Sequence, residues 1–277
     1  MADTKIQRRI LNIDGINLFF LDSGGDKPPM VCLHGRWGRG ETWVDLIERY
    51  SNRFRIIAPD QRGHGLSDRP VASYEAEEMA GDIYVLAKRL ECGPIIILGH
   101  SMGGRIAAHL TALYPNDVRA LIILDETADG PESRSKLPPE KVSPIDELTD
   151  KWPTPYATYR DAVNDLSARF RQTNVRYFLD SLHETAVGYD FLFSRYAMSA
   201  IKEYYSSWFH LLPNIKCPTM LVRAVDSWCL PRESAKKMAS LIKNCRYIEI
   251  ANSDHMVYAD NPVEFYPELD LFLENVK

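Results

Sequence analysis

A serine flanked by glycines is the residue in this sequence best placed to act as a nucleophile. Ser101 lies in Gly99-His-Ser-Met-Gly103, which has the pattern G-x-S-x-G. An apolar run at residues 94–98 precedes it, and a helix-forming stretch follows it. A serine at such a sharp strand-to-helix turn projects toward a ligand, and the glycines let neighbouring backbone pass close by. We predict that Ser101 is a nucleophile rather than an ordinary turn serine.

A serine hydroxyl needs a base to take its proton, and His255 suits that role. It follows the last apolar run and comes after Ser101 in the chain. We expect the remaining histidines to form structural hydrogen bonds (His34, His100) or to lack a partner at metal-ligand spacing (His64, His109, His183, His210). We therefore predict that His255 is the general base and that no metal is bound.

Two aspartates compete to orient His255. A carboxylate at the far nitrogen of the imidazole fixes its tautomer and stabilises the imidazolium that forms during attack. Asp125 ends the apolar run at residues 120–124, and Asp226 follows the run at residues 219–222. Parallel strands that end at the same sheet edge can present either carboxylate, so the residues alone leave both open.

Together these segments resemble the α/β-hydrolase family. Residues 99–103 look like the family's nucleophile turn, and residues 31–35 (VCLHG) resemble its strand ending in His-Gly. Residues 58–67 (APDQRGHGLS) resemble its D-x-R-G-x-G-x-S turn. Residues 252–255 (NSDH) are similar to its histidine segment, with Ser253 in place of the usual glycine. The resemblance implies the family's fold and an acyl-transfer site.

The same resemblance implies an oxyanion hole. The backbone NH groups of Arg36 and Met102 would hold the developing negative charge, and the helix beginning at Met102 would add its positive end. The Arg36 side chain could also recognise a substrate carboxylate, but we expect only its backbone to take part.

The family resemblance also favours one acid over the other. In most of the family the acid lies nine residues after a proline equivalent to Pro218, and Ser227 occupies that position here. Asp226 lies one residue early, and a one-residue shift in an extended segment reverses the direction of the side chain. Some relatives carry the acid at the position of Asp125. We therefore predict Asp125 as the triad acid, with Asp226 as the alternative.

The elements that must position these residues alternate between apolar runs and helix-forming segments, which predicts βαβ units. Residues 8–23 read as a hairpin turning at Asp14-Gly15. Further strands are predicted at 30–33, 55–58, 94–98, 120–124, 219–222 and 246–250, and helices at 41–50, 74–90, 104–113, 232–243 and 262–276. Continuous apolar strands are typical of sheets covered on both faces. We expect an α/β-hydrolase fold with a mostly parallel eight-stranded sheet flanked by helices.

Residues 128–212 break this alternation, because they contain helix-like stretches and no clear strand. We interpret them as a helical cap inserted between two parts of a hydrolase core, residues 1–127 and 213–277. The insertion holds 14 of the 29 aromatic residues. We expect most of these rings to form the insertion's own core and a few to line an apolar pocket over Ser101.

Composition argues against several other classes of protein. Acidic residues (38) outnumber basic ones (33), and no basic run stands out, so we expect no nucleic-acid partner. No apolar stretch approaches the ~20 residues of a membrane span, and no export signal is evident. Five cysteines without a C-x-x-C pair predict neither disulfides nor structural zinc, which favours the cytoplasm. The glycines at 35, 38 and 40 do not match a nucleotide-binding fingerprint.

We expect serine-dependent hydrolysis of a small carboxylic ester, thioester or lactone through an acyl-enzyme, with no cofactor. A serine at the nucleophile position argues against the halide and epoxide reactions that use an aspartate. Two alternatives stay open: cleavage of a carbon-carbon or amide bond by the same triad, and a slow-turnover ligand receptor on this fold. The sequence does not identify the acyl group, the leaving group or the oligomeric state.

Overall fold

The centre of the molecule is an eight-stranded, mostly parallel sheet. The computed structural model describes residues 6–276 and gives the strand order β1-β2-β4-β3-β5-β6-β9-β10. The strands are β1 (Gln7–Ile13), β2 (Ile16–Asp22), β3 (Pro29–Leu33), β4 (Arg55–Pro59), β5 (Ile95–His100), β6 (Val118–Leu124), β9 (Thr219–Ala224) and β10 (Cys245–Ile250). β2 pairs antiparallel with β1 and β4, and the other pairs are parallel. The predicted fold class is confirmed.

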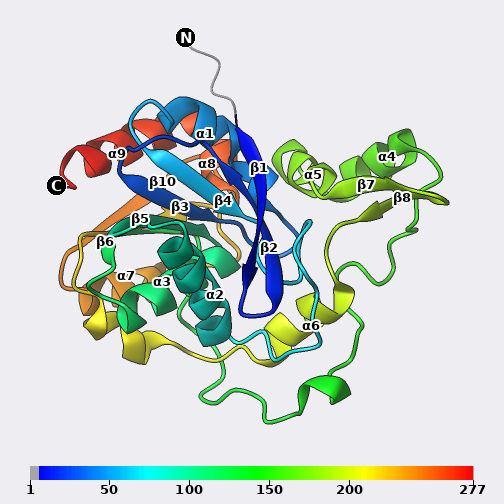
Figure 1. Cartoon of the computed structure of the whole chain (residues 1–277), viewed down its shortest axis with the longest axis horizontal. Helices are drawn as coiled ribbons and strands as arrows, with labels where there is room; N and C mark the ends of the chain where they lie inside the picture. The colour runs from blue at the N-terminus through cyan, green and yellow to red at the C-terminus, as the bar shows by residue number, and fades with distance from the viewer. Residues whose placement is uncertain (1–5, 277) are drawn as a thin grey trace.

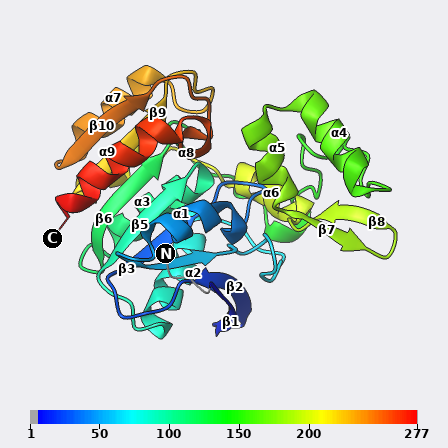
Figure 2. The ribbon, with the colours of Figure 1, turned by 90° about the horizontal axis from the view of Figure 1, so that it is seen from above.

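Helices cover both faces of this sheet (Figures 1 and 2). α2 (Ala76–Arg89), α3 (Met102–Leu113) and α7 (Arg232–Leu241) pack on one face, whereas α1 (Val44–Tyr50), α8 (Val257–Asp260) and α9 (Pro262–Glu274) pack on the other. A short 3-10 helix, η1 (Gly40–Trp43), leads into α1. Successive residues of β5 point to opposite faces. Ile97 packs in the core under α2, α3 and α7, and Leu98 packs in the core under α1, α8 and α9. The strands read as continuous apolar runs because both faces of the sheet are buried.

The first hairpin turns where the sequence predicts. Asp14 and Gly15 have φ angles of 47° and 96°, and the strands pair in register on either side of them. Asp-Gly is suited to this two-residue turn because both positions need positive φ.

Most of the segment between β6 and β9 lies to one side of the sheet (Figure 2), but its last part packs against α3 and α7. It contains α4 (Tyr159–Arg169), α5 (Gln172–Leu179) and α6 (Arg195–Glu203), with the 3-10 helices η2 (Pro139–Lys141) and η3 (Phe209–Asn214). It also contains a hairpin, β7 (Leu182–Thr185) and β8 (Gly188–Phe191), so the expectation of no strand there was wrong. These strands are four residues long and mix polar with apolar residues, which hides the period-2 pattern.

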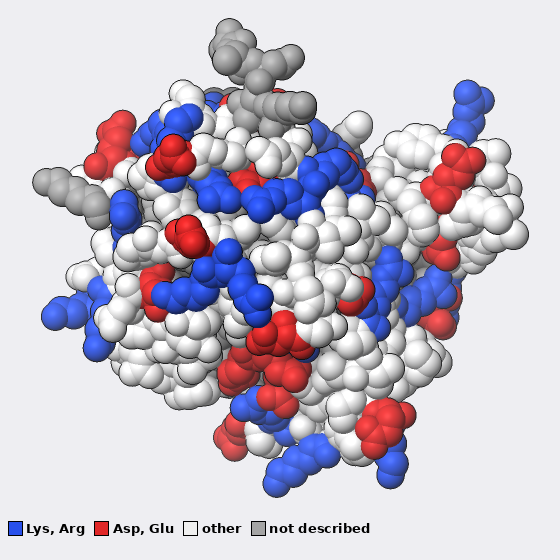
Figure 3. Space-filling view, in the orientation of Figure 1, with Lys and Arg blue, Asp and Glu red and all other residues white. Residues whose placement is uncertain are grey.

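Acidic and basic side chains are interspersed on the face drawn in Figure 3. Beneath the surface, the buried Asp22 at the end of β2 accepts hydrogen bonds from Arg9 at 2.7 Å and from Arg55 at 2.8 Å. Within residues 6–276, no helix combines the length and apolar character needed to cross a membrane.

Candidate active site

Ser101 lies at a strained turn between β5 and α3. Its φ and ψ are 53° and −129°, and its backbone NH donates to the Leu124 carbonyl on β6 at 2.9 Å. A Cβ at Gly99 would lie 2.1 Å from the Gly103 oxygen, and one at Gly103 would lie 2.4 Å from the Leu33 oxygen. Both glycines are needed because backbone occupies the space of a side chain. The turn therefore holds Ser101 in a conformation that an L-residue rarely adopts.

His255 meets a carboxylate at the nitrogen that faces away from the cavity. Its Nδ1 lies 2.8 Å from Oδ2 of Asp125, and Asp125 is fully buried. The Asp125 carboxylate also accepts hydrogen bonds from the Ala224 NH at 2.9 Å and the Ser227 hydroxyl at 2.6 Å. Because an ionised carboxylate only accepts, Nδ1 carries the proton and Nε2 is left free to receive one.

Asp226, the alternative acid, lies on the surface. Its backbone NH donates to the Ser253 carbonyl at 3.0 Å, and the residue is exposed in the loop after β9. Of the carboxylates on the two competing strands, the structure brings that of Asp125 to His255. The neighbouring Ser227 turns inward and reaches Asp125 instead.

Two further histidines from the sequence motifs support the site without titrating in it. His100 Nε2 donates to the His255 carbonyl at 2.9 Å, and the centres of the two imidazole rings are 4.5 Å apart. Burial, and then the charge of His255, holds the pKa of His100 well below its ordinary value, so its ring stays neutral. The Gln61 NH donates to Nε2 of His34 at 3.0 Å, which leaves the Nδ1 proton of His34 for the Gly35 carbonyl. Both rings bind backbone groups near Ser101.

The two expected oxyanion donors follow the ends of two neighbouring strands, β3 and β5. Met102 is the first residue of α3, and Arg36 lies in the turn that follows β3. The Arg36 guanidinium donates to Asp146 at 2.9 Å and to the Met198 carbonyl at 3.1 Å. Its charge is thus already paired within the protein.

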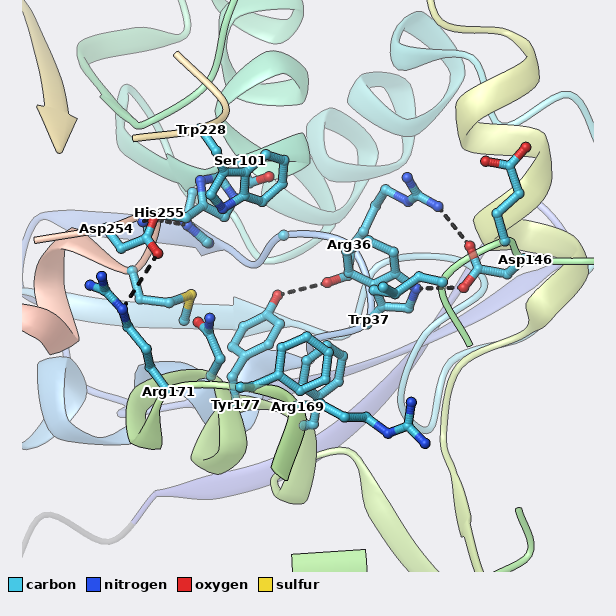
Figure 4. A pocket seen from close by; sticks show the side chains of 18 of the residues that line it. Arg36, Trp37, Ser101, Asp146, Arg169, Arg171, Tyr177, Trp228, Asp254 and His255 are labelled. Atoms are coloured by element: carbon cyan, nitrogen blue, oxygen red, sulfur yellow. Dashed lines mark hydrogen bonds and ion pairs between the residues drawn. The ribbon is translucent and has the colours of Figure 1, made fainter. Parts of the chain in front are cut away.

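Ser101 lies in the wall of a cavity of about 600 Å³ (Figure 4). Its walls come from the core, including Ser101, His255 and Trp228, and from the segment between β6 and β9. Three of that segment's rings line it, namely Phe170, Tyr177 and Phe178. Others pack internally, as Trp152 does against Phe191 with ring centres 5.3 Å apart. The exposed Trp228 adds a ring whose centre is 4.7 Å from that of His255.

Several charged side chains of the segment also face this cavity, and sequence reasoning assigned no role to them. Arg169 is held by both oxygens of Asp165, at 2.9 and 2.8 Å, and Lys202 by Glu147 at 2.5 Å. Arg171 makes a much longer ion pair, 3.9 Å from Asp254, and its side chain is 61% exposed. Arg171 is therefore the cavity cation with the weakest partner among these three.

Comparison with known proteins agrees with this fold. The family model described as alpha/beta hydrolase fold matches residues 28–183, more than half of the chain. The chain is 40% identical over 126 residues to 2-(acetamidomethylene)succinate hydrolase from Mesorhizobium japonicum, over 46% of this chain and 45% of that enzyme, so the match spans under half of the relative.

Two other similarities extend over nearly the whole chain. It is 24% identical to (E)-2-((N-methylformamido)methylene)succinate hydrolase from Acinetobacter baylyi, over 90% of this chain and 92% of that one. The crystal structure of E-2-(acetamidomethylene)succinate hydrolase superposes with a TM-score of 0.85 at 25% identity, covering 97% of this chain and 99% of the other. This chain therefore belongs to the alpha/beta hydrolase family.

Proposed function

We propose that this chain is a serine hydrolase that cleaves the amide bond of a small N-acylated amine bearing carboxylate groups. The observation that carries the serine mechanism is the contact of 2.8 Å between His255 Nδ1 and the buried Asp125, beside a nucleophile held at a strained turn. This arrangement prepares Nε2 of His255 to accept the Ser101 proton.

The reaction would proceed by acyl transfer in two halves. Ser101 attacks the carbonyl carbon as His255 takes its proton, and the NH groups of Arg36 and Met102 hold the oxyanion. Each such donor contributes about 2.7 to 4 kcal/mol to the transition state in comparable sites. The imidazolium then protonates the leaving nitrogen, and the carbon-nitrogen bond breaks. Water, deprotonated by His255, attacks the acyl-Ser101 ester and releases the carboxylic acid and the free serine.

The choice of an amide is supported by the two named relatives. Both names describe an acylated nitrogen on a carbon-carbon double bond, in a molecule with the two carboxyl groups of a succinate. Such a nitrogen delocalises its electrons over the double bond, so it leaves more readily than an alkylamine. The basic side chains at the cavity, Arg171 above all, suit a substrate that carries carboxylates.

A carboxylic ester is the second candidate. The sequence itself favours it, and the same three residues hydrolyse esters through the same intermediate. An ester leaving group needs less help from the imidazolium than an amine does, so ester turnover alone does not identify the natural bond.

The decisive experiment compares one acyl group on three leaving groups. Purified protein is given an N-acetylaminomethylene succinate, the matching enol ester and a neutral aryl acetate, and acetate release is measured for each. We expect the amide to have the highest kcat/KM, Ser101→Ala to abolish all three activities, and mass spectrometry to find an acetyl group on Ser101. An ester preference above 100-fold would favour the second candidate. Binding without turnover that depends on Ser101 would instead indicate a receptor.

A further inference from the structure

The turn after β3 that carries Arg36 is strained. Gly38 NH donates to the Gly35 carbonyl at 3.3 Å, which closes a tight turn with Arg36 and Trp37 at its centre. Trp37 has a φ of 64°, a conformation that a bulky L-residue rarely adopts. Rotation of the Arg36–Trp37 peptide would relieve this conformation, so something outside the turn must hold it.

The segment between β6 and β9 supplies the groups that hold it. The Tyr177 hydroxyl on α5 donates to the Arg36 carbonyl at 3.1 Å, as Figure 4 shows, and the Ser181 hydroxyl donates to the Trp37 carbonyl at 2.7 Å. Asp146 accepts from the Arg36 guanidinium at 2.9 Å and from the Trp37 indole at 3.0 Å. Both central carbonyls and both central side chains of the turn are therefore bound by one inserted segment.

These contacts are buried and closely fitted. Tyr177, Ser181 and Asp146 are 6%, 1% and 2% exposed. A Cβ at Gly38 would lie 2.0 Å from the Tyr177 hydroxyl oxygen, so the phenol occupies the space that a larger residue 38 would need. Burial raises the pKa of Tyr177 far above its ordinary value, so the hydroxyl keeps its proton and remains a donor.

We infer that Tyr177 is a positioning residue for the oxyanion hole. Its hydroxyl fixes the Arg36 carbonyl on one side of the turn. The Arg36 NH belongs to the preceding peptide, whose Gly35 carbonyl accepts from the Gly38 NH at 3.3 Å and from His34 Nδ1 at 2.8 Å. With that peptide anchored, holding the Arg36 carbonyl as well restricts rotation about the Arg36 backbone bonds and keeps the NH in one direction. The inserted segment would then complete the catalytic centre as well as enclose the substrate. The inference rests on the proposed serine mechanism, and it holds for either an amide or an ester.

The test removes the hydroxyl and keeps the ring, because the ring also lines the cavity. Tyr177→Phe should lower kcat 10- to 100-fold, leave KM within about twofold, and leave the pH dependence of kcat/KM in place. Affinity for a trifluoromethyl ketone, which forms an oxyanion on Ser101, should fall by the same factor as kcat/KM, whereas affinity for the product acid should not change. A tyrosine that only stabilises the fold would not separate these two ligands.

Tyr196→Phe is the matched control. The Tyr196 hydroxyl lies 2.9 Å from each of two carbonyl oxygens, those of Ala72 and Pro139, and donates its single proton between them. Tyr196 is not part of the cavity wall. Equal losses in the two variants, or a change in KM alone for Tyr177→Phe, would overturn the inference.

Labelling of Ser101 by a fluorophosphonate separates this inference from the proposed function, because it needs no natural substrate. Slower labelling in Tyr177→Phe than in Tyr196→Phe supports the positioning role even where the amide is not turned over. Unchanged labelling in Tyr177→Phe, with Ser101→Ala unlabelled, leaves the serine mechanism intact and refutes the role of Tyr177.

Discussion

The Ser227 hydroxyl donates to Oδ2 of Asp125 at 2.6 Å, and His255 Nδ1 reaches the same oxygen at 2.8 Å. Ser227 is the position at which the family's usual arrangement places the acid itself. Here the carboxylate comes from the end of the neighbouring strand, β6, and Ser227 binds it from the loop after β9. The Ser227 oxygen also accepts from the Leu230 NH at 2.8 Å, so the loop that holds it is fixed in turn.

This arrangement predicts that Asp125 and Asp226 behave differently when each is changed to asparagine. Asp125→Asn should lower kcat by up to ~10⁴, because an amide at that place favours the wrong imidazole tautomer. Asp226→Asn, an exposed change, should leave kcat within about twofold. Both are measured on one good substrate, with circular dichroism to check folding. A large loss in Asp226→Asn alone would restore the usual arrangement.

The contact with Ser227 predicts that the acid that orients His255 can be moved from position 125, after β6, to position 227, after β9. Asp125→Ser alone should be nearly inactive, whereas the double variant with Asp125→Ser and Ser227→Asp should regain at least tenfold in kcat. The two side chains already lie within hydrogen-bond distance, so the new carboxylate starts next to the vacated place. The single variant Ser227→Asp puts two carboxylates in contact and should unfold more easily. No recovery in the double variant would mean that β9 cannot present an acid to His255.

kcat/KM should rise with pH in a single step, as one imidazole loses its proton. Only neutral imidazole accepts the Ser101 proton, and histidine side chains ordinarily titrate within about pH 6 to 8. His100 and His34 should add no second step, because burial, followed by the charges of neighbouring histidines, holds the pKa of each well below that range. Rates are measured with a substrate that does not titrate there and with chemistry shown to limit them. A flat profile would argue against His255 as base.

Acid should weaken the fold through buried histidines. Burial lowers the pKa of His64 and that of His109 to about 4, whereas an unfolded histidine titrates near ~6.5. Between those values the unfolded chain binds protons that the native chain does not, so the free energy of unfolding falls as the pH drops from ~6.5 toward ~4. At ~1.4 kcal/mol per pKa unit, each of these histidines lowers the free energy of unfolding by up to about 3 kcal/mol over this range.

Buried carboxyl groups act in the opposite direction, since burial raises the pKa of Asp60 and of Glu126. The useful measurement is therefore a difference, taken from urea unfolding at pH 7.5 and pH 5 for the wild type and for His109→Gln. The wild type should lose more stability than the variant between the two values. Equal losses would show that His109 protonates as readily in the folded chain as in the unfolded one.

The loosely paired cation at the cavity predicts a selective effect on binding. Arg171→Gln should raise KM about tenfold for a substrate with carboxylates, since a charge-assisted hydrogen bond contributes ~1.5 to 3 kcal/mol. KM for a neutral aryl ester should not change. Arg169→Gln is the control, because Arg169 is already bound by both oxygens of Asp165. If Arg169→Gln has the larger effect, or if the neutral ester is affected equally, Arg171 is not a carboxylate contact.

The elements around Ser101 were predictable because their signals are local. β5 is buried along its whole length and runs directly into a glycine-bounded turn, so a short window of sequence contains both the strand and its end. The choice of acid was harder. It depends on how the ends of two strands meet, as in the bond from the Ala224 NH to Asp125, which joins residues 99 positions apart. The register of the family was needed to favour Asp125.

The contacts that bind the turn after β3 left no local signal at all. Asp146 and Ser181 lie 109 and 144 positions from Trp37, and each resembles an ordinary polar loop residue in the sequence. Tyr177 was one ring among many in an aromatic segment. Such pairings depend on where the insertion docks, which periodicity and propensity do not encode.

The two ends of the segment between β6 and β9 lie next to each other. The Trp208 NH donates to the Ala128 carbonyl at 3.2 Å, the Ser207 NH donates to the Pro131 carbonyl at 2.8 Å, and β6 and β9 pair directly beneath. A piece of chain that leaves and returns at one point can be lengthened, shortened or exchanged at little entropic cost. A different segment at that junction would therefore change the cavity walls while the pairing of β6 with β9 stays in place. Such a segment would also have to supply a hydroxyl for the Arg36 carbonyl, which limits the segments that would leave the enzyme active.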